Sequence, residues 1–285
     1  MSIVIVLLLV WVAASFSRAI FTPKGGNSEG KIITGHRGGA GLGLENSIEC
    51  IERGMAAGAT SIEIDVHITA DGKVVVCHDP TLDRTTDTSG AINDLTLDQI
   101  KAARLTNANG EATEQTIPTL EQVLQTIDGG VELLLEIKRT KGNNKGIEQA
   151  VLNILKEHNA LSYTVIQSFD DSVLETLHTL DPSLKLEKLL FGKILGLPLI
   201  FDGTLNYFST DKYHYIRSFN FYHKALSAPL SRYLHSKGYR TRIWTVNDPK
   251  TLKAVALDGI ISLCPYHQEE DKERRGRKKK NTLTA

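Results

Sequence analysis

Short apolar stretches alternate with amphipathic stretches through most of the chain, from about Lys31 to Pro265. The apolar stretches have the length and β-branched composition of strands, whereas the amphipathic ones repeat apolar residues every three or four positions, as helices do. Strands are expected at 32–35, 61–68, 74–78, 132–138, 163–168, 186–191, 216–219, 240–246 and 259–263. Helices are expected at 45–57, 119–127, 144–158, 171–180, 225–237 and 249–257. Strands that alternate with helices are typical of an α/β fold with βα units around a parallel sheet.

The number of these units predicts a (β/α)8 barrel of the TIM type. Eight strand–helix units close a barrel in about 250 residues, and the chain has 285. Because nine strands are expected, one of them should lie outside the barrel, as a hairpin partner or an external strand. The polar stretch 79–117, with a helical turn or two at 97–104, is too long for a passive connection. We therefore expect a small insertion after the third strand that caps a site.

The N-terminal segment contains an apolar run at residues 3–14 with no Lys or Arg before it. The run is shorter than the roughly 20 residues of a spanning helix and is typical of a signal peptide that is cleaved near Ala19. Since basic residues follow the run, an uncleaved helix would instead leave the main domain in the cytoplasm. We expect a signal peptide or membrane anchor at 1–21, followed by a linker at 22–31. The main expectation for localisation is export or tethering outside the cytoplasm, and a cytoplasm-facing anchor is the alternative.

The rest of the chain divides into a barrel domain at 32–267 and a basic tail at 268–285, which we expect to be disordered. A basic run of this kind is attracted to anionic lipid headgroups. The apolar stretch 189–201 is expected to form a core strand and the following helix, with a lipid-facing lip on the site as the alternative. Together with the apolar run near the N-terminus, these features lead us to expect membrane association.

Composition removes several classes of function. The 33 basic and 33 acidic side chains leave a formal net charge of zero, so no nucleic-acid partner is expected. Three cysteines are too few for a disulfide scaffold or a four-thiolate zinc site, and we expect them to be buried as small apolar residues. With 41% hydrophobic and 23% charged residues, the bulk of the chain is an ordinary globular protein.

Two of the expected strands carry acids where a barrel would have its interior. Strict alternation places Glu63 and Asp65 on the face opposite the apolar residues of their strand, and Glu136 and Lys138 share the inward face of another. Converging carboxylates repel one another and lose hydration, so they need a cation. Oxygen ligands without a thiolate favour Mg²⁺ or Ca²⁺. The alternative is that these acids only form ion pairs, with Lys138 or with Arg37.

Two histidines stand at the ends of expected strands. His36 precedes Arg37 at the end of the first strand, and His78 precedes Asp79 at the end of another. Active sites of barrels lie at the carboxyl ends of the strands, and histidine is an effective acid or base near neutral pH. We therefore expect both histidines at a catalytic site. Asp79 could orient His78, but we favour a role in capping the following turn.

These residues, with further motifs in the same order, resemble the glycerophosphodiester phosphodiesterase family. The motifs are His36-Arg37-Gly38, Glu45-Asn46-Ser47, Glu63-Ile64-Asp65, Asp71-Gly72, His78-Asp79, Thr85-Thr86 with Gly90, Ile117-Pro118-Thr119-Leu120, Glu136-Ile137-Lys138, Gln167-Ser168-Phe169 and Trp244-Thr245-Val246-Asn247. The resemblance covers nearly all of the expected folded region. Each motif alone is weak, but the ordered set is specific. Leu44 and Leu263 depart from the family, which commonly has Pro and Asp there, and neither position carries a proton or a ligand.

The resemblance implies metal-dependent hydrolysis of a glycerophosphodiester to sn-glycerol 3-phosphate and an alcohol. The implied roles are metal binding by Glu63, Asp65 and Glu136, general base and general acid catalysis by His36 and His78, phosphate binding by Arg37 and Lys138, a place near the metal or the glycerol for Glu45, and pocket lining by Gln167, Phe169 and Trp244. The chemistry agrees, because a phosphodiester gains negative charge on attack and one divalent cation with two basic side chains would stabilise it.

Three other functions are weighed against this one. A lysophospholipase D with the same site would act on lysophospholipids, and the N-terminal apolar run, the apolar stretch 189–201 and the basic tail suit it. A catalytically silent phosphate- or lipid-binding module would lack site residues, and none is missing. A phosphatidylinositol-type lyase on a related barrel is disfavoured by the Glu-x-Asp and Glu-x-Lys pairs.

Overall fold

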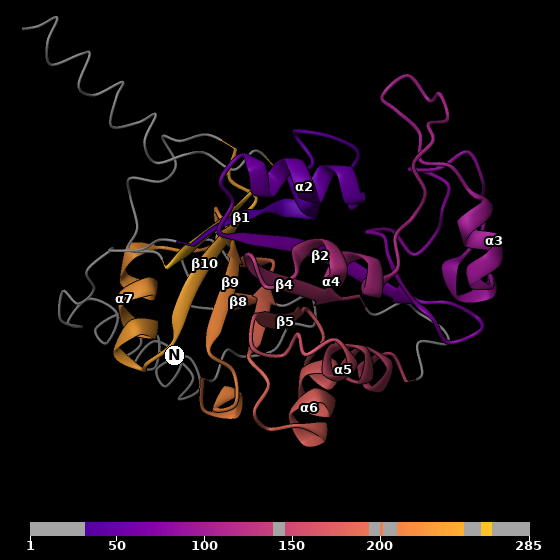
Figure 1. Ribbon diagram of the computed structural model, residues 1–285. Coiled ribbons are helices and arrows are strands. Elements are labelled where there is room, and N and C mark those ends of the chain that lie inside the picture. Colours follow the sequence, from indigo (N-terminus) through magenta and orange to yellow (C-terminus); the bar gives the residue numbers. More distant parts are fainter. Residues whose placement is uncertain (1–31, 139–145, 194–199, 202–209, 248–257, 264–285) are drawn as a thin grey trace, which may run out of the picture.

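The computed structural model describes residues 32–138, 146–193, 200–201, 210–247 and 258–263 (Figure 1). The expected leader or anchor at 1–21, the linker at 22–31, the helix at 249–257 and the tail at 268–285 lie outside these residues. Among the helices that are described, none has the length and apolar character needed to cross a bilayer.

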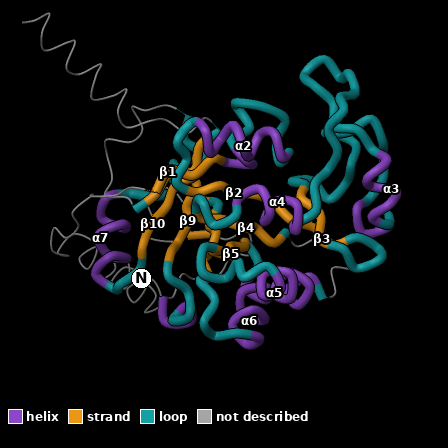
Figure 2. Tube along the Cα trace, in the orientation of Figure 1, coloured by secondary structure: helices purple, strands orange, loops and turns teal. Residues whose placement is uncertain are grey.

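Eight parallel strands form a closed barrel, as expected (Figures 1 and 2). They are β1 (Ile32–Gly35), β2 (Ser61–Ile68), β4 (Glu132–Ile137), β5 (Thr164–Ser168), β6 (Leu186–Leu190), β9 (Ser218–Tyr222), β10 (Arg240–Trp244) and β11 (Gly259–Ser262). The order is β1-β11-β10-β9-β6-β5-β4-β2, and the pairing of Thr34 with Ser61 joins β1 to β2 and closes the barrel. Parallel strands that close in this way bring all their carboxyl ends to one mouth.

Five of the described helices lie on the outside of the barrel, with apolar residues packed between them and the strands (Figure 2). They are α2 (Ile48–Ala56), α4 (Leu120–Ile127), α5 (Ile147–Glu157), α6 (Asp171–Leu180) and α7 (Ala228–Ser236). In α4, Thr119 and Gln122 form a reciprocal capping box, while Val123, Leu124 and Ile127 are buried on one face. Capping of this kind satisfies two backbone donors at the start of the helix, which explains why it begins directly after Pro118.

The ninth expected strand lies outside the barrel. β3 (Val74–Val76) runs antiparallel to the outer half of β2, with Val76 opposite Val66. It ends two residues before His78, so His78 is not at the end of a barrel strand, and that part of the expectation was wrong. The hairpin instead returns the chain to the mouth, where the Cys77 N–H donates to the Asp65 carbonyl over 2.9 Å. His78 reaches the mouth from outside the barrel wall.

The insertion that follows β3 has a small core of its own. It contains the 3₁₀ turn η2 (Ile92–Asp94) and the helix α3 (Leu97–Ala102), and it lies beside β3 at the right of Figure 2. Its buried residues are Val75, Cys77, Leu82, Ile92, Ile100, Ala103, Leu105 and Ile117, with Leu44 packed against them. Because Val75 and Leu44 belong to segments that border the mouth, this core holds the insertion against the rim.

The stretch 189–201 departs from the expected strand and helix. β6 ends at Leu190, and the short strands β7 (Gly192–Lys193) and β8 (Ile200–Phe201) pair antiparallel to each other. Residues 194–199 lie outside the described part. Short 3₁₀ turns, η1 (His36–Gly38) and η3 (Thr210–Tyr213), complete the described elements. The described cysteines, Cys50 and Cys77, are buried, as expected.

The interior of the barrel is charged at its amino end. Arg242 Nε lies 3.0 Å from Glu187 Oε2, and Arg242 Nη2 lies 2.8 Å from Glu132 Oε1. Arg217 contacts the other oxygen of each acid, with Nε 2.8 Å from Glu187 Oε1 and Nη2 3.0 Å from Glu132 Oε2. Two acids thus meet two arginines, and the charges balance.

A thin apolar layer lies inside the barrel as well. Leu134, Val165 and Ile261 pack together there, with Trp244 against them. Leu134 lies midway between Glu132 and Glu136 on the inward face of β4, so this layer separates the charged amino end from the acids near the mouth.

Candidate active site

Three carboxylates meet at the carboxyl end of the barrel. Glu63 and Asp65 lie on β2, and Glu136 lies on β4 opposite Asp65 in the register. All three side chains are buried, and their ligand atoms lie within 4.8 Å of one another. The alternation along both strands explains the cluster, because every second residue faces the interior.

The three acids cannot all be ionised at neutral pH without added positive charge. Burial raises the pKa of Glu63 well above its ordinary value and that of Glu136 to about 7, and the charge of Asp65 adds to both. Burial would raise the pKa of Asp65 too, but the charge of Lys138, together with the two histidines and the hydrogen bond from Asn46, lowers that pKa. Loss of hydration and like-charge repulsion are the cause.

Lys138 neutralises only part of the negative charge of the three acids. Its Nζ lies 2.9 Å from Asp65 Oδ1 and 2.7 Å from Glu136 Oε1. Asn46 Nδ2 donates to Asp65 Oδ2 over 3.0 Å, while Glu63 Oε1 is buried and makes no hydrogen bond with the described residues. Ion pairing therefore accounts for two of the acids, and the free oxygen of Glu63 fits a ligand to a hard divalent cation.

His36 lies next to the acid cluster at the end of β1. Its Nε2 is 3.8 Å from Glu63 Oε2, and its Nδ1 is 3.3 Å from Thr245 Oγ1. Burial, aided by the positive charges of Arg37 and Lys138, lowers the pKa of His36 to about 4. The imidazole is therefore neutral near pH 7 and can accept a proton.

The turn after His36 directs a backbone N–H toward Glu63. Arg37 has a left-handed backbone (φ 53°), and its N–H donates to Glu63 Oε2 over 2.8 Å. Helix α2 lies close to this turn because Gly54 has no side chain: a Cβ there would lie 2.2 Å from the Gly38 carbonyl oxygen. The guanidinium Nη1 of Arg37 donates to both carboxylate oxygens of Glu45 over 3.2 Å.

His78 is held at both its ring and its backbone. Its Nδ1 lies 2.6 Å from Asp79 Oδ1, and its carbonyl oxygen accepts from His67 Nε2 over 3.3 Å. Burial and the charge of Lys138 lower the pKa of His78. The expected turn-capping role of Asp79 was wrong, because its oxygens meet His78 and the Arg84 guanidinium. Asp79 orients the histidine ring instead.

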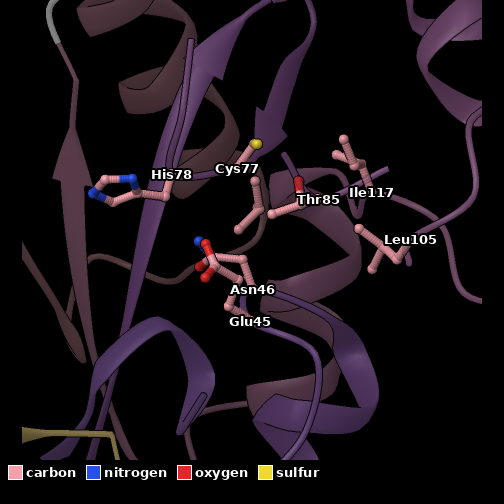
Figure 3. Close-up of a pocket in the computed structure, with 8 residues that line it drawn as sticks. Glu45, Asn46, Cys77, His78, Thr85, Leu105 and Ile117 are labelled. Atoms are coloured by element: carbon pink, nitrogen blue, oxygen red, sulfur yellow. The ribbon is translucent and has the colours of Figure 1, made fainter. Parts of the chain in front are cut away.

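Glu45 lies where the insertion meets the rim. Arg84 Nη1 and Nη2 donate to its two oxygens over 2.9 and 2.6 Å. Burial would raise the pKa of Glu45, but the hydrogen bonds from Arg84 and the charge of Arg37 lower it. Figure 3 shows Glu45 and His78 in a pocket that is also lined by Asn46, Val76, Cys77, Thr85, Leu105 and Ile117.

Four aromatic rings border the mouth at the strands that carry no acid ligand. Phe169 follows β5 and lies edge-on to Trp244 of β10, with ring centroids 5.6 Å apart. Phe191 lies 5.9 Å from Trp244 and stacks on Tyr222 at 5.9 Å. Trp244 Nε1 donates to the Asn220 carbonyl over 3.1 Å. These rings offer an apolar surface opposite the polar half of the site.

Gln167 lies deeper than the other expected pocket residues. It is opposite Glu136 in the register of β4 and β5, and its side chain is buried. Its Oε1 accepts from Asn220 Nδ2 over 2.8 Å, and Asn220 also donates to Glu187 over 2.8 Å. Gln167 thereby connects the layer of the acids with the charged amino end.

The structure brings nearly every expected site residue to one mouth and adds others. Those that sequence reasoning did not assign are Asn46, Arg84, Phe191, Tyr222 and Thr245. Asn46 and Thr245 stand inside quoted motifs, so adjacency could have pointed to them. Arg84 stands in the polar stretch expected to cap a site, but no spacing rule connects it to Glu45, 39 residues away.

The chain is similar to known phosphodiesterases in sequence and in fold. Residues 36–262 match the glycerophosphoryl diester phosphodiesterase family. A glycerophosphodiester phosphodiesterase of Bacillus altitudinis is 30% identical over 240 residues, which cover 82% of this chain and 94% of that protein. A solved glycerophosphodiester phosphodiesterase of Thermotoga maritima is 25% identical, with a TM-score of 0.63 over 82% of this chain and 94% of that one. An Oleispira antarctica phosphodiesterase, solved with the product sn-glycerol-3-phosphate, shares the fold at 24% identity, with a TM-score of 0.72 over 88% of this chain and 96% of that one.

Proposed function

Since the chain belongs to the glycerophosphoryl diester phosphodiesterase family and is an enzyme of that class, we propose that it hydrolyses glycerophosphodiesters by metal-assisted acid–base catalysis. The products would be sn-glycerol 3-phosphate and an alcohol. The observation that carries the proposal is the buried Glu63, Asp65 and Glu136 cluster, in which one oxygen of Glu63 makes no hydrogen bond with the described residues and which His36 borders.

Glu63, Asp65 and Glu136 would hold one divalent cation, Mg²⁺ or Ca²⁺. Both ions take carboxylate oxygens, and the raised pKa values of Glu63 and Glu136 are those of groups that need a cation to stay ionised. The cation would stabilise the charge that develops on the phosphoryl oxygens.

Arg37 and Lys138 would hold the phosphate. Arg37 Nε is buried and makes no hydrogen bond with the described residues, so it has a donor to offer. Lys138 lies between two of the acids and brings a positive charge to the same place. Cationic donors placed where charge develops lower the barrier more than they strengthen substrate binding.

His36 and His78 would act as base and acid. The neutral His36 takes the proton of the nucleophile, a water molecule or a hydroxyl of the glycerol. His78 keeps Nδ1 on Asp79 and so presents Nε2 to the leaving oxygen. Asp65 and Asp79 favour the protonated ring of His78, which is the form that enters this step. As the bond from phosphorus to the leaving oxygen breaks, that oxygen takes its electron pair and the proton of Nε2, and His78 becomes neutral.

The remaining pocket residues would select the substrate. Glu45 lies beside Arg37 and would border the glycerol end. Phe169 and Trp244 would contact the alcohol part, and Gln167 would support the floor of the pocket. The solved Oleispira antarctica phosphodiesterase carries sn-glycerol-3-phosphate, which supports the same product here.

We keep export or tethering outside the cytoplasm as a proposal that rests on the apolar run at 3–14 alone, with the cytoplasm-facing anchor as its alternative. The features that suit lysophospholipids and membranes lie largely at 1–31, 194–199 and 264–285, outside the described residues. Of these features, part of the stretch 189–201 is described, and its Phe191 ring borders the mouth beside Trp244. The family match supports the deacylated diester as the proposed substrate.

The test is choline release from glycerophosphocholine by the full chain, with EDTA, Mg²⁺ or Ca²⁺. We expect release that EDTA abolishes and one of the ions restores, with sn-glycerol 3-phosphate identified by phosphorus NMR. Lysophosphatidylcholine is the comparison substrate. Release that is indifferent to EDTA would remove the cation from the mechanism, and release from the lysolipid alone would replace the proposed substrate.

A further inference from the structure

Arg84 of the insertion joins two acids that serve different parts of the site. Its Nη1 and Nη2 donate to the two oxygens of Glu45 over 2.9 and 2.6 Å, and its Nε donates to Asp79 Oδ2. The other oxygen of Asp79 lies 2.6 Å from His78 Nδ1. The contacts therefore run without a break from His78 through Asp79 and Arg84 to Glu45.

Most exposed ion pairs contribute little, and Arg84 differs from them in its geometry. Its side chain is 47% exposed, yet three of its donors are engaged at once, with the fork of the guanidinium matched to both oxygens of Glu45. Paired forks and networks of several charges are the surface pairs that hold a defined geometry. Glu45 is itself fixed from the other side by Arg37.

The hydrogen bond from Arg84 fixes the orientation and the charge of Asp79. A carboxylate that meets a histidine through one oxygen can still rotate and accept water. Here Arg84 occupies the second oxygen, and this hydrogen bond lowers the pKa of Asp79 to about 2, so Asp79 stays ionised. An oriented carboxylate at Nδ1 sets the ring plane and keeps a proton on that nitrogen. The Nε2 of His78 is then the atom that faces the substrate.

We propose that Arg84 is a positioning residue for His78, which acts through Asp79 and is anchored on the rim by Glu45. This rests on the proposed function, in which His78 protonates the leaving alcohol. Among the described residues, Arg84 contacts Asp79 and Glu45 and none of the three acids assigned to the cation. The insertion therefore supplies the support that aligns the acid, and the barrel supplies the acid cluster.

The test compares two diesters of glycerol 3-phosphate, one with choline and one with p-nitrophenol as the leaving group. The phenolate departs without a proton, whereas the choline alkoxide needs one. Arg84→Ala should lower kcat on glycerophosphocholine by about 10²-fold and change kcat on the nitrophenyl ester by less than about threefold. Guanidinium ion in the assay should restore part of the lost choline release.

Arg104→Ala is the matched control, because Arg104 is an insertion arginine whose guanidinium donates to the Glu114 carbonyl and not to a site residue. Its kcat should be unchanged on both esters. Arg84→Lys should recover less than half of the loss, since an ammonium cannot reach three oxygens in the fork geometry. Equal losses on the two esters would overturn the proposal in favour of substrate binding, and no loss on either would reduce Arg84 to a surface ion pair.

A spectrum separates this proposal from the proposed function. Nitrogen-15 NMR of the imidazole rings, with the His78 signal assigned from its absence in His78→Ala, reports which ring nitrogen holds the proton. We expect a protonated Nδ1 in the wild type and a mixture of tautomers in Arg84→Ala. If the wild type cleaves neither ester, the proposed function fails, whereas an identical His78 spectrum in both proteins overturns the positioning role.

Discussion

Both ends of the barrel interior combine acidic and basic side chains, but the charges balance at the amino end and not at the carboxyl end. At the amino end, Glu132 and Glu187 meet Arg217 and Arg242 through four contacts of 2.8 to 3.0 Å. At the carboxyl end, Lys138 lies within 3 Å of two of the three acids, Arg37 Nε lies 3.9 Å from Asp65 Oδ2, and one oxygen of Glu63 makes no hydrogen bond with the described residues. Glu132 and Glu136 lie four residues apart on the same strand, so the strand alone does not decide which effect an acid has.

The difference lies in the balance of charge. A buried acid that is matched by an arginine fork has its desolvation offset by geometry and hydrogen bonds. A buried acid in excess keeps a raised pKa and gains most from a cation that arrives from solution. The charges at the amino end therefore stabilise the fold, whereas the excess of acids at the carboxyl end favours binding of a cation.

The largest effects should follow from the histidines at the carboxyl end. His36→Ala and His78→Ala should each lower kcat by at least about 10²-fold, because each removes one proton transfer. The melting temperature should stay near that of the wild type. Steady-state kinetics and thermal unfolding check this. His235→Ala is the control, since His235 also pairs with an aspartate, Asp258, but on the outside of the barrel. Near-normal turnover in either site variant would show that the acid–base pair is assigned wrongly.

Arg242→Ala, at the amino end, should lower the stability of the protein. Arg242 is 2% exposed and pairs with Glu187 and Glu132, so its removal leaves Arg217 as the one arginine that faces these two acids and takes the only buried cation from Glu187 among the described residues. The free energy of unfolding should fall by about 3–5 kcal/mol. Denaturant titration measures it, and Arg240→Ala on the same strand, where the side chain is exposed, should cost less than about 0.5 kcal/mol. If the free energy of unfolding falls no more than in the control, the ion pairs at the amino end do not stabilise the fold.

Glu63→Gln should weaken cation binding and stabilise the protein without metal. The change removes one of the clustered charges but keeps the shape, so affinity for Mg²⁺ or Ca²⁺ should fall at least about tenfold. Without metal, the variant should unfold at a higher temperature than the wild type, because less like charge is buried. Calorimetry with each ion and thermal unfolding check both effects. Glu49→Gln on the exposed face of α2 should change neither. An unchanged affinity would remove Glu63 from the ligands.

The smallest effect is a pH dependence of metal stabilisation. The folded-state pKa of Glu136 is about 7 against an ordinary 4.5. Its contribution to the stability of the metal-free protein is thus fully present below pH 4.5 and is lost as the pH rises through 7. Cation binding requires the ionised form, so the rise in melting temperature on adding metal should be larger at pH 8 than at pH 5. An equal rise at both pH values would mean that the acids are already ionised without metal.

The acid ligands could be predicted because a local pattern specifies them. The observed bounds of β1 and β2 match the expectation, and alternation along β2 and β4 correctly placed Glu63, Asp65 and Glu136 inside the barrel. The position of His78 was expected for the wrong reason, because an antiparallel strand of three residues looks like a short barrel strand in sequence. The role of Asp79 was missed, because an Asp after a strand equally suits a turn cap.

Contacts between site residues that lie far apart in the sequence could not be predicted from it. Arg84 meets Glu45 only because the insertion folds on a core of its own against the rim. The ring contacts of Phe191 and Tyr222 with Trp244 depend on the closure of β6, β9 and β10 into neighbouring strands. Neither depends on a period of two or of 3.6 residues, so no local pattern could reveal it.

The sequence by itself determined the barrel, the inward acids and the residues that carry the family resemblance, because strand alternation and motif order are local properties of a chain. Only the tertiary structure decided which acids are neutralised and which stay in excess. That outcome depends on which basic side chains the closed barrel brings within about 3 Å of each carboxylate, and Coulomb interactions in a buried site change steeply with that distance. At the amino end, Arg217 and Arg242 lie within about 3 Å of both acids, whereas at the mouth Lys138 comes that close to two of the three acids and Arg37 stays 3.9 Å from Asp65, so the excess of acids lies at the mouth.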